Sequence, residues 1–236
     1  MPQGKQARET VKKHFESTAA NTASQTISKL TGSVKCFYLD RLKQSSGTLL
    51  DVGCAQGIWS DYWHGRGFEV TGFDFSSTFI KEAKARFGHK IKFFQADLME
   101  YKTKERFDVV FCCTVLMYIP DYRNAIKKMA ARVKPGGALI LLEPSASYPI
   151  RKLRHLLRGG QPLNVPERAF SKKELEAIFA EEGMKITDYD GFLHFEYLIA
   201  KLPFLADLWL WLERMQKPNS LKKYGAKILV KAVKPV

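Results

Sequence analysis

The sequence has few of the features that mark membrane-spanning or secreted proteins. Its 236 residues contain no apolar run long enough to cross a bilayer, no signal peptide, no internal repeat and no low-complexity tract. We therefore expect a cytoplasmic protein. A chain of this length buries a sizeable core without help from disulfides or metals, so we expect one ordinary catalytic or binding domain.

Cysteine is also scarce, with only Cys36, Cys54, Cys112 and Cys113 in the chain. Their spacing does not match a metal site, and the neighbouring Cys112 and Cys113 point to opposite faces of a predicted strand. We expect reduced thiols that pack in the core, and no bound metal. Because Cys54 and Cys113 follow the ends of predicted strands, they are also candidates to line a pocket.

Acidic residues are outnumbered, with 24 Asp and Glu against 38 Lys and Arg, so the formal net charge is +14. Basic proteins attract nucleic acids. However, no RNA-binding module is recognisable, and the basic residues are spread along the chain except in residues 151–158 and 217–234. Nucleic acid is therefore a disfavoured partner, and peripheral contact with an anionic membrane surface is an alternative.

The most informative segment that is present covers residues 49–57, with the sequence LLDVGCAQG. Its apolar residues are typical of a buried parallel strand. Gly53 and Gly57 allow a sharp turn and the close approach of a ligand. A helix that begins near Gly57 offers unpaired backbone N–H groups to that ligand. The segment predicts a ligand site at the end of a central strand.

Four further apolar segments predict strands over residues 69–74, 91–95, 107–112 and 138–142. The first of these ends at Asp74, about 20 residues beyond the glycine turn, where a carboxylate binds ribose hydroxyls in related sheets. An N-cap for the next helix is the alternative role of Asp74. Parallel strands bring their carboxyl ends to one edge, where open α/β sheets bind ligands. We expect a doubly wound, mostly parallel sheet.

In this order, the segments resemble class I S-adenosylmethionine-dependent methyltransferases of the small-molecule type. The matching motifs are residues 50–57, Asp74, residues 96–97, residues 107–110 and residues 133–137. The resemblance implies a seven-stranded Rossmann-like sheet with a helical cap and inserts. It also implies S-adenosylmethionine as cofactor, S-adenosylhomocysteine as product and no metal.

The sequence departs from the family pattern in two places. Ala55 and Gln56 stand where many members have glycine and a small hydroxyl residue, so the contacts of this loop differ in detail. Met117 and Tyr118 stand where many relatives have Glu-His. A histidine base at that position is therefore excluded.

The resemblance also implies which residues bind the cofactor. Asp51, Gly53 and Gly57 are expected to shape the methionine end of the site. Asp74 is expected to hold the ribose, and Asp97 with Leu98 the adenine. The expected set is completed by neighbours on the same strand ends, namely Cys54, Ala55, Gln56, Phe75, Ala96, Cys112 and Cys113.

Methyl transfer from a sulfonium needs mainly positioning and exclusion of water. If the acceptor is a hydroxyl or an ammonium, a group must take its proton, and the candidates are Tyr118, His155, His194 and Glu143. Tyr118 is the best placed, directly after the fourth strand, with simple packing as its alternative. His194 has apolar neighbours, and a role as a core histidine is favoured. The expected substrate-binding residues are Tyr38, Tyr118, Tyr148, His194 and Trp209.

Residues 1–46 are predicted to form a helical cap, and residues 47–236 the methyltransferase domain. Two substrate-side inserts are predicted at residues 145–169 and 192–220. Residues 192–215 are rich in leucine and aromatic side chains. Such an apolar segment is expected to be buried against another surface. Four alternatives stay open: packing over the sheet, a lid on an apolar pocket, a homodimer interface and a membrane contact.

The sequence thus favours methyl transfer to a small, largely apolar acceptor, such as a quinone or isoprenoid precursor, an aromatic natural product or a lipid. An RNA or protein methyltransferase and a non-catalytic cofactor-binding protein are the alternatives. A nucleotide-dependent oxidoreductase is disfavoured, because the glycine turn lacks the dinucleotide-binding pattern. The atom that accepts the methyl group, oxygen, nitrogen or carbon, is left open.

Overall fold

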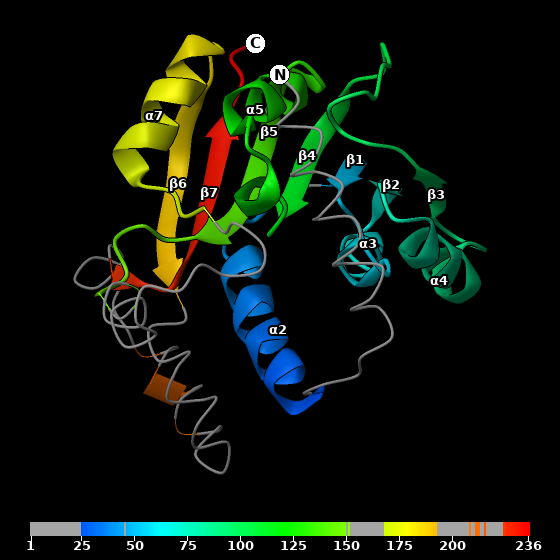
Figure 1. Ribbon diagram of the computed structural model, residues 1–236, viewed down its shortest axis with the longest axis horizontal. Helices are drawn as coiled ribbons and strands as arrows, with labels where there is room; N and C mark the ends of the chain where they lie inside the picture. The colour runs from blue at the N-terminus through cyan, green and yellow to red at the C-terminus, as the bar shows by residue number, and fades with distance from the viewer. Residues whose placement is uncertain are drawn as a thin grey trace.

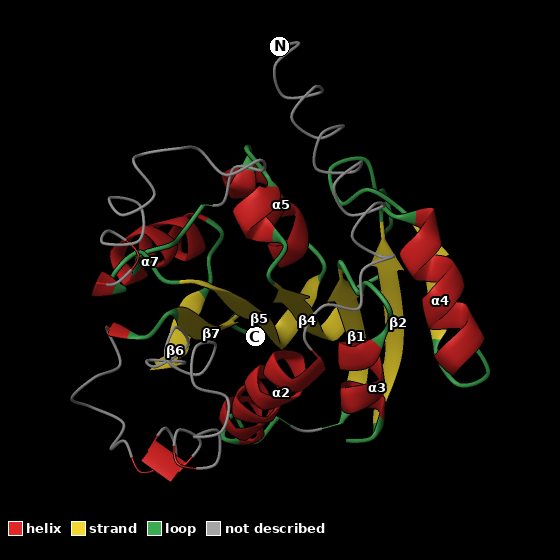
Figure 2. Ribbon diagram, turned by 60° about the horizontal axis from the view of Figure 1, so that its bottom comes forward, coloured by secondary structure: helices red, strands yellow, loops and turns green. Residues whose placement is uncertain are grey.

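The computed structural model describes residues 25–44, 46–149, 168–192 and 224–236, together with Arg151, Leu208, Trp211, Leu212 and Met215. These residues form one mixed sheet with helices on both of its faces (Figures 1 and 2). None of their helices is long and apolar enough to cross a membrane. Most of residues 192–215, on which the membrane and dimer predictions rest, lies outside this set.

The sheet has seven strands in the order β3-β2-β1-β4-β5-β7-β6. Neighbours among β1 to β5 are parallel, whereas β7 runs antiparallel to both β5 and β6. The prediction of a mostly parallel, doubly wound sheet is confirmed. The strands are β1 (Gly47–Val52), β2 (Phe68–Asp74), β3 (Lys92–Gln95), β4 (Phe107–Cys113), β5 (Val133–Pro144), β6 (Lys185–Phe192) and β7 (Lys227–Val233).

Two apolar layers hold the helices against the sheet. One layer joins the sheet to α2 (Gln25–Asp40), α3 (Ile58–His64) and α4 (Ser77–Phe87). The other layer joins it to α5 (Tyr122–Ala130), α7 (Lys172–Glu181) and the short 3-10 helix η1 (Leu116–Tyr118). Figure 2 shows α2 and α3 on one side of the sheet and α5 and α7 on the other.

Residues 96–106, between β3 and β4, form turns and extended chain in place of a helix. Aromatic side chains cover this part of the sheet. The ring of Tyr101 lies 4.9 Å from that of Phe73 and 5.4 Å from that of Phe94, measured between centroids. Aromatic pairs at such distances stabilise the fold by more than their buried area alone. These three rings therefore pack on the sheet at a place where a helix packs on it elsewhere.

One strand is longer than predicted. The prediction placed the strand at residues 138–142, but β5 already begins at Val133, and a register shift opposite Phe107 and Val109 accommodates the extra residues. β6 continues to Phe192, which is fully buried. Residues 193–223 of the predicted second insert lie outside the described residues, except Leu208, Trp211, Leu212 and Met215. Residues 1–24 of the predicted cap lie outside the described residues.

Candidate functional site

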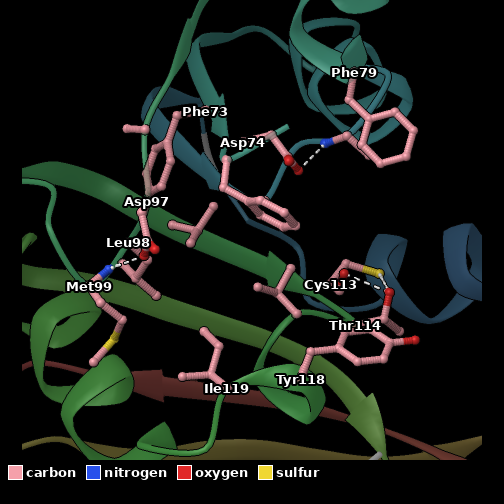
Figure 3. A pocket seen from close by; sticks show the side chains of 16 residues that line it. Phe73, Asp74, Phe79, Asp97, Leu98, Met99, Cys113, Thr114, Tyr118 and Ile119 are labelled. Carbon is pink, nitrogen blue, oxygen red and sulfur yellow. Dashed lines mark hydrogen bonds between the residues drawn. The ribbon is translucent and has the colours of Figure 1, made fainter. Parts of the chain in front are cut away.

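A pocket opens at the carboxyl edge of β1, β2 and β4 (Figure 3). Four chain segments line it, each following the end of a strand, as the parallel order predicts. The lining residues at or beyond the strand ends are Val52, Gly53 and Ala55 for β1; Phe73, Asp74, Phe75 and Phe79 for β2; Ala96, Asp97, Leu98 and Met99 for β3; and Cys113, Thr114, Val115, Tyr118 and Ile119 for β4.

The loop after β1 has a backbone that requires small residues. Gly53 has a φ of +72°, and a Cβ added to it would lie 2.3 Å from Cγ2 of Val115. Gly57 has a φ of +80° and caps the N-terminus of α3. Ala55 adopts a φ of +45°, which costs an L-residue conformational energy. The conformation of the loop thus requires glycine or a small residue at these three positions.

Asp74 holds this loop through its carboxylate. Oδ2 accepts the N–H of Ala55 at 3.0 Å, and Oδ1 accepts the N–H of Ser76 at 2.9 Å. The N-cap of α4 is Ser76, whose Oγ accepts the N–H of Phe79 at 3.3 Å, so the alternative role of Asp74 as N-cap does not hold. Burial raises the pKa of Asp74. Each carboxylate oxygen has a further lone pair for a ligand hydroxyl.

Asp97 lies on the pocket wall after β3. Its Oδ1 accepts the N–H of Met99 at 2.7 Å, which fixes the turn that presents Leu98. Figure 3 shows Asp97, Leu98 and Met99 grouped on one side of the pocket, with Phe73 beside them. This side combines a carboxylate with apolar surface, a combination that suits an aromatic ring bearing an amine.

Five residues of the expected cofactor set do not line the pocket. Asp51 is only 2% exposed and accepts the hydroxyl of Ser60 at 2.6 Å, while burial raises its pKa to about 7. Gln56 donates through Nε2 to Glu82 at 2.6 Å and so ties the loop to α4. The remaining three are buried and do not line the pocket: Cys54, Gly57 and Cys112.

Glu143, at the end of β5, is fully buried and does not line the pocket. Its Oε1 accepts the N–H groups of Val115 and Leu116, each at 3.0 Å, and its Oε2 accepts that of Met117 at 3.3 Å. Burial raises its pKa to about 7, against the lowering effect of these hydrogen bonds. The carboxylate thus positions the segment that carries Tyr118.

Of the other described residues predicted to act in catalysis or substrate binding, one lines the pocket. Tyr118 lines the pocket. Tyr38 does not; it is buried on α2 and stacks on Phe192 with ring centroids 5.0 Å apart. Tyr148 is half-buried and packs against the same apolar layer. Three predicted residues lie outside the described part of the chain: His155, His194 and Trp209.

Sequence reasoning missed several pocket residues. Thr114 has a φ of +56°, rare for a β-branched residue, and its hydroxyl donates to the carbonyl of Cys113 at 2.7 Å. The local sequence gives no sign that Thr114 has a positive φ. Its position directly after a strand end was, however, a usable clue that it lines the pocket. The same clue applies to the other residues missed: Val52, Phe73, Phe79, Met99, Val115 and Ile119.

The lining of the pocket is chemically compatible with an adenosine. Two carboxylates, Asp74 and Asp97, lie on an otherwise apolar and aromatic wall, and they can accept hydrogen bonds from ribose hydroxyls and an adenine amine. No group of His, Cys, Asp and Glu among the described residues could hold a metal ion. All four cysteines are free thiols.

Comparison with known proteins gives the same assignment. A family model described as a methyltransferase domain matches residues 28–189. The ubiquinone biosynthesis O-methyltransferase of Stutzerimonas stutzeri is 36% identical over 94 residues, which cover 38% of this chain and 40% of that protein. The protein of the same name from Coxiella burnetii is 36% identical over 115 residues, covering 47% and 49%. The match thus spans less than half the length of these relatives.

A solved structure shows the same fold over nearly the whole chain. The magnesium protoporphyrin IX methyltransferase of Synechocystis PCC 6803, with bound SAH, superposes with a TM-score of 0.67 at 16% identity and covers 96% of this chain and 99% of that one. The cofactor of the protein is S-adenosylmethionine. By its sheet order and by the family model that covers most of its length, the chain belongs to the class I S-adenosylmethionine-dependent methyltransferases.

Proposed function

We propose that the protein transfers a methyl group to a hydroxyl of a small, largely apolar acceptor of the quinone-precursor or aromatic type. The observation that carries this proposal is the apolar wall beyond the two carboxylates, which includes Val115, Tyr118 and Ile119. Apolar and aromatic walls with few polar groups are typical of sites for small lipophilic molecules. The two relatives named as ubiquinone biosynthesis O-methyltransferases support the choice of a hydroxyl acceptor.

S-adenosylmethionine, when bound, supplies a methyl group on a positively charged sulfur and departs as a neutral thioether. The residues of the chain then have to hold the two reactants in line and exclude water. We assign ribose binding to Asp74 and adenine binding to Asp97. We assign the methionine part of the cofactor to the side of the pocket at Gly53, which lines it and has no side chain of its own.

The acceptor hydroxyl loses its proton as its oxygen bonds to the methyl carbon. We assign to Tyr118 a hydrogen bond that orients this hydroxyl, with the proton released to solvent. Glu143 supports this role indirectly, because its three backbone hydrogen bonds fix the segment from Val115 to Tyr118. An oriented reactant is worth several powers of ten in rate when its geometry is fixed in advance.

The test measures formation of S-adenosylhomocysteine with two acceptors, catechol and a catechol that carries a propyl chain. Burial of each carbon of an alkyl chain contributes about 0.8 kcal/mol. The three carbons of the propyl chain then contribute about 2.4 kcal/mol, so we expect a KM roughly 50-fold lower for the propyl compound. Methylation of total RNA or of protein, with neither catechol methylated, would contradict the proposal.

Tyr118→Phe tests the orienting hydroxyl. We expect kcat to fall about 10-fold with little change in KM for the cofactor. Tyr189→Phe is the matched control, because Tyr189 lies on β6 outside the pocket lining and loses the same hydroxyl. Equal kcat values for Tyr118→Phe and the wild type would remove Tyr118 from the mechanism.

A further inference from the structure

The short helix η1 carries Tyr118 at the pocket, and its backbone is held from two sides. On one side, the buried carboxylate of Glu143 accepts the N–H groups of residues 115–117. On the other side, the N–H of Arg168 donates to the carbonyl of Met117 at 2.9 Å. Because Met117 is buried, its N–H and its carbonyl both need partners within the protein. The two contacts together fix the residue that directly precedes Tyr118.

The side chain of Arg168 is itself held by two helices. Its Nη2 pairs with Oε1 of Glu174 on α7 at 2.6 Å. Its guanidinium lies over the ring of Tyr122 on α5, with Cζ 4.0 Å from the ring centroid. The hydroxyl of Tyr122 donates to the same carboxylate oxygen of Glu174 at 2.8 Å. Figure 2 shows α5 and α7 on the same side of the sheet. The three side chains thus form a closed set, in which each contacts the other two.

The exposure of these three side chains indicates what their contacts do. The side chain of Arg168 is 45% exposed and that of Glu174 is 21% exposed. An ion pair this exposed contributes little to the stability of the whole fold. A guanidinium that is stacked on a ring and bonded to a carboxylate nevertheless has a defined position. The contacts are therefore suited to fixing where the backbone of Arg168 lies.

The place of Arg168 in the chain connects η1 to the first predicted insert. Residues 152–167 lie outside the described residues, and the described chain resumes at Arg168. Two positions later, the N–H of Phe170 donates to the carbonyl of Pro144, at the end of β5, at 2.9 Å. The chain that follows the insert thus bonds first to η1 and then to the sheet.

We propose that Arg168 is a positioning residue, which acts on methyl transfer through Tyr118. Its guanidinium is fixed between α5 and α7, so its N–H holds the carbonyl of Met117 in one place. The side chain of Tyr118 then keeps the orientation in which its hydroxyl meets the acceptor. The proposal rests on the proposed function, in which Tyr118 orients the acceptor hydroxyl.

A double-mutant cycle tests whether Arg168 acts through Tyr118. Arg168→Met removes the guanidinium and keeps the backbone N–H. With the propyl-substituted catechol, we expect kcat to fall roughly 5-fold in Arg168→Met, while the affinity for S-adenosylhomocysteine stays within about 2-fold of the wild type. Tyr118→Phe has no hydroxyl to orient, so adding Arg168→Met to it should change kcat less than about 2-fold. An equal fold loss in both backgrounds would overturn the proposal.

Arg123→Met is the matched control. Arg123 also joins α5 to α7, through a pair with Glu181 at 3.5 Å, and its side chain is 51% exposed. We expect wild-type kcat in this variant. If Arg123→Met lowers kcat as much as Arg168→Met does, the effect belongs to the packing of the two helices and the proposal is wrong.

Amide hydrogen exchange of enzyme saturated with S-adenosylhomocysteine tests the position of η1 without any acceptor. We expect the N–H groups of residues 115–119 to exchange roughly 5-fold faster in Arg168→Met than in the wild type or in Arg123→Met. Exchange at the wild-type rate in Arg168→Met would disprove the proposal. A wild-type kcat in Tyr118→Phe alone would instead remove Tyr118 from the proposed function, and exchange would still decide whether Arg168 holds η1.

Discussion

Asparagine at position 74 would remove the charge of the carboxylate that joins the loop after β1 to the start of α4. In the wild type each oxygen of Asp74 has its own backbone donor, the N–H of Ala55 and that of Ser76. An amide has only one oxygen. In Asp74→Asn, one of these two N–H groups must therefore face an NH₂ group and lose its acceptor.

Two effects of this substitution have different magnitudes. An N–H left without an acceptor costs about 1–3 kcal/mol, and the side chain is only 5% exposed, so water does not replace the lost bond. We expect a loss of about 2 kcal/mol in the free energy of unfolding, or about 4–8 °C in Tm. The loss of charge-assisted bonds to ribose hydroxyls should weaken cofactor binding by about 2 kcal/mol more, which is roughly 30-fold.

Urea unfolding without ligand measures the first effect, and calorimetric titration with S-adenosylmethionine measures the second. Asp121→Asn is a matched control, because Asp121 caps the exposed start of α5 and asparagine serves equally well there. A cofactor affinity of Asp74→Asn within about 3-fold of the wild type would refute the assignment of the ribose to Asp74. Unchanged unfolding would refute the structural half of the reasoning.

Three further results are expected. Glu143→Ala should lower the free energy of unfolding by about 3 kcal/mol and weaken S-adenosylhomocysteine binding, because three N–H groups around η1 lose their acceptor; urea unfolding with wild-type midpoints would contradict this. The free energy of unfolding should fall as pH rises from about 4 to about 7, because burial raises the folded-state pKa of Asp51 and of Glu143 to about 7, from 3.8 and 4.5. Asp108, whose pKa is lowered to about 2, affects stability only below about pH 4. Urea midpoints that stay constant between about pH 4 and about pH 7 would exclude the effect. Gly53→Ala should lose cofactor affinity and at least about 1 kcal/mol of stability, since its Cβ would meet Val115 at 2.3 Å; thermal melting and calorimetry identical to those of the wild type would disprove it.

The architecture was predictable where local sequence carries the information. The apolar strand before Gly53 and the carboxylate of Asp74 one strand later identify the sheet edge, because strand ends and glycine turns are local features. The start of β5 was not predictable. Pro135 and Gly136 are typical of a turn, and they lie in the irregular stretch between the pairs Phe107–Val133 and Val109–Ala138. The N–H of Gly136 bonds instead to the carbonyl of Lys234, just after β7, at 3.0 Å.

The site was predictable in part for the same reason. Asp74 and Asp97 follow strand ends, and both line the pocket. The role of Glu143 depends on backbone donors 26 to 28 positions away, and the contact of Lys35 Nζ on α2 with Sγ of Cys113 joins residues 78 positions apart. No local pattern encodes such pairs, since they arise only when the sheet is assembled and the cap helix packs on it.

The points where the two inserts leave the sheet are joined to one another. Ser145 pairs with Phe170 in an isolated bridge and donates its N–H to the carbonyl of Ala226 at 3.0 Å. Beside Ala226, Gly225 packs so closely on the backbone of Phe192 that a Cβ would lie 2.2 Å from its nitrogen. Because the ends are already together, the entropy of closing either loop changes only slowly with its length. We therefore expect these two segments to tolerate changes in length and sequence at little cost to the sheet, so this is where related chains can diverge most while they keep the same scaffold.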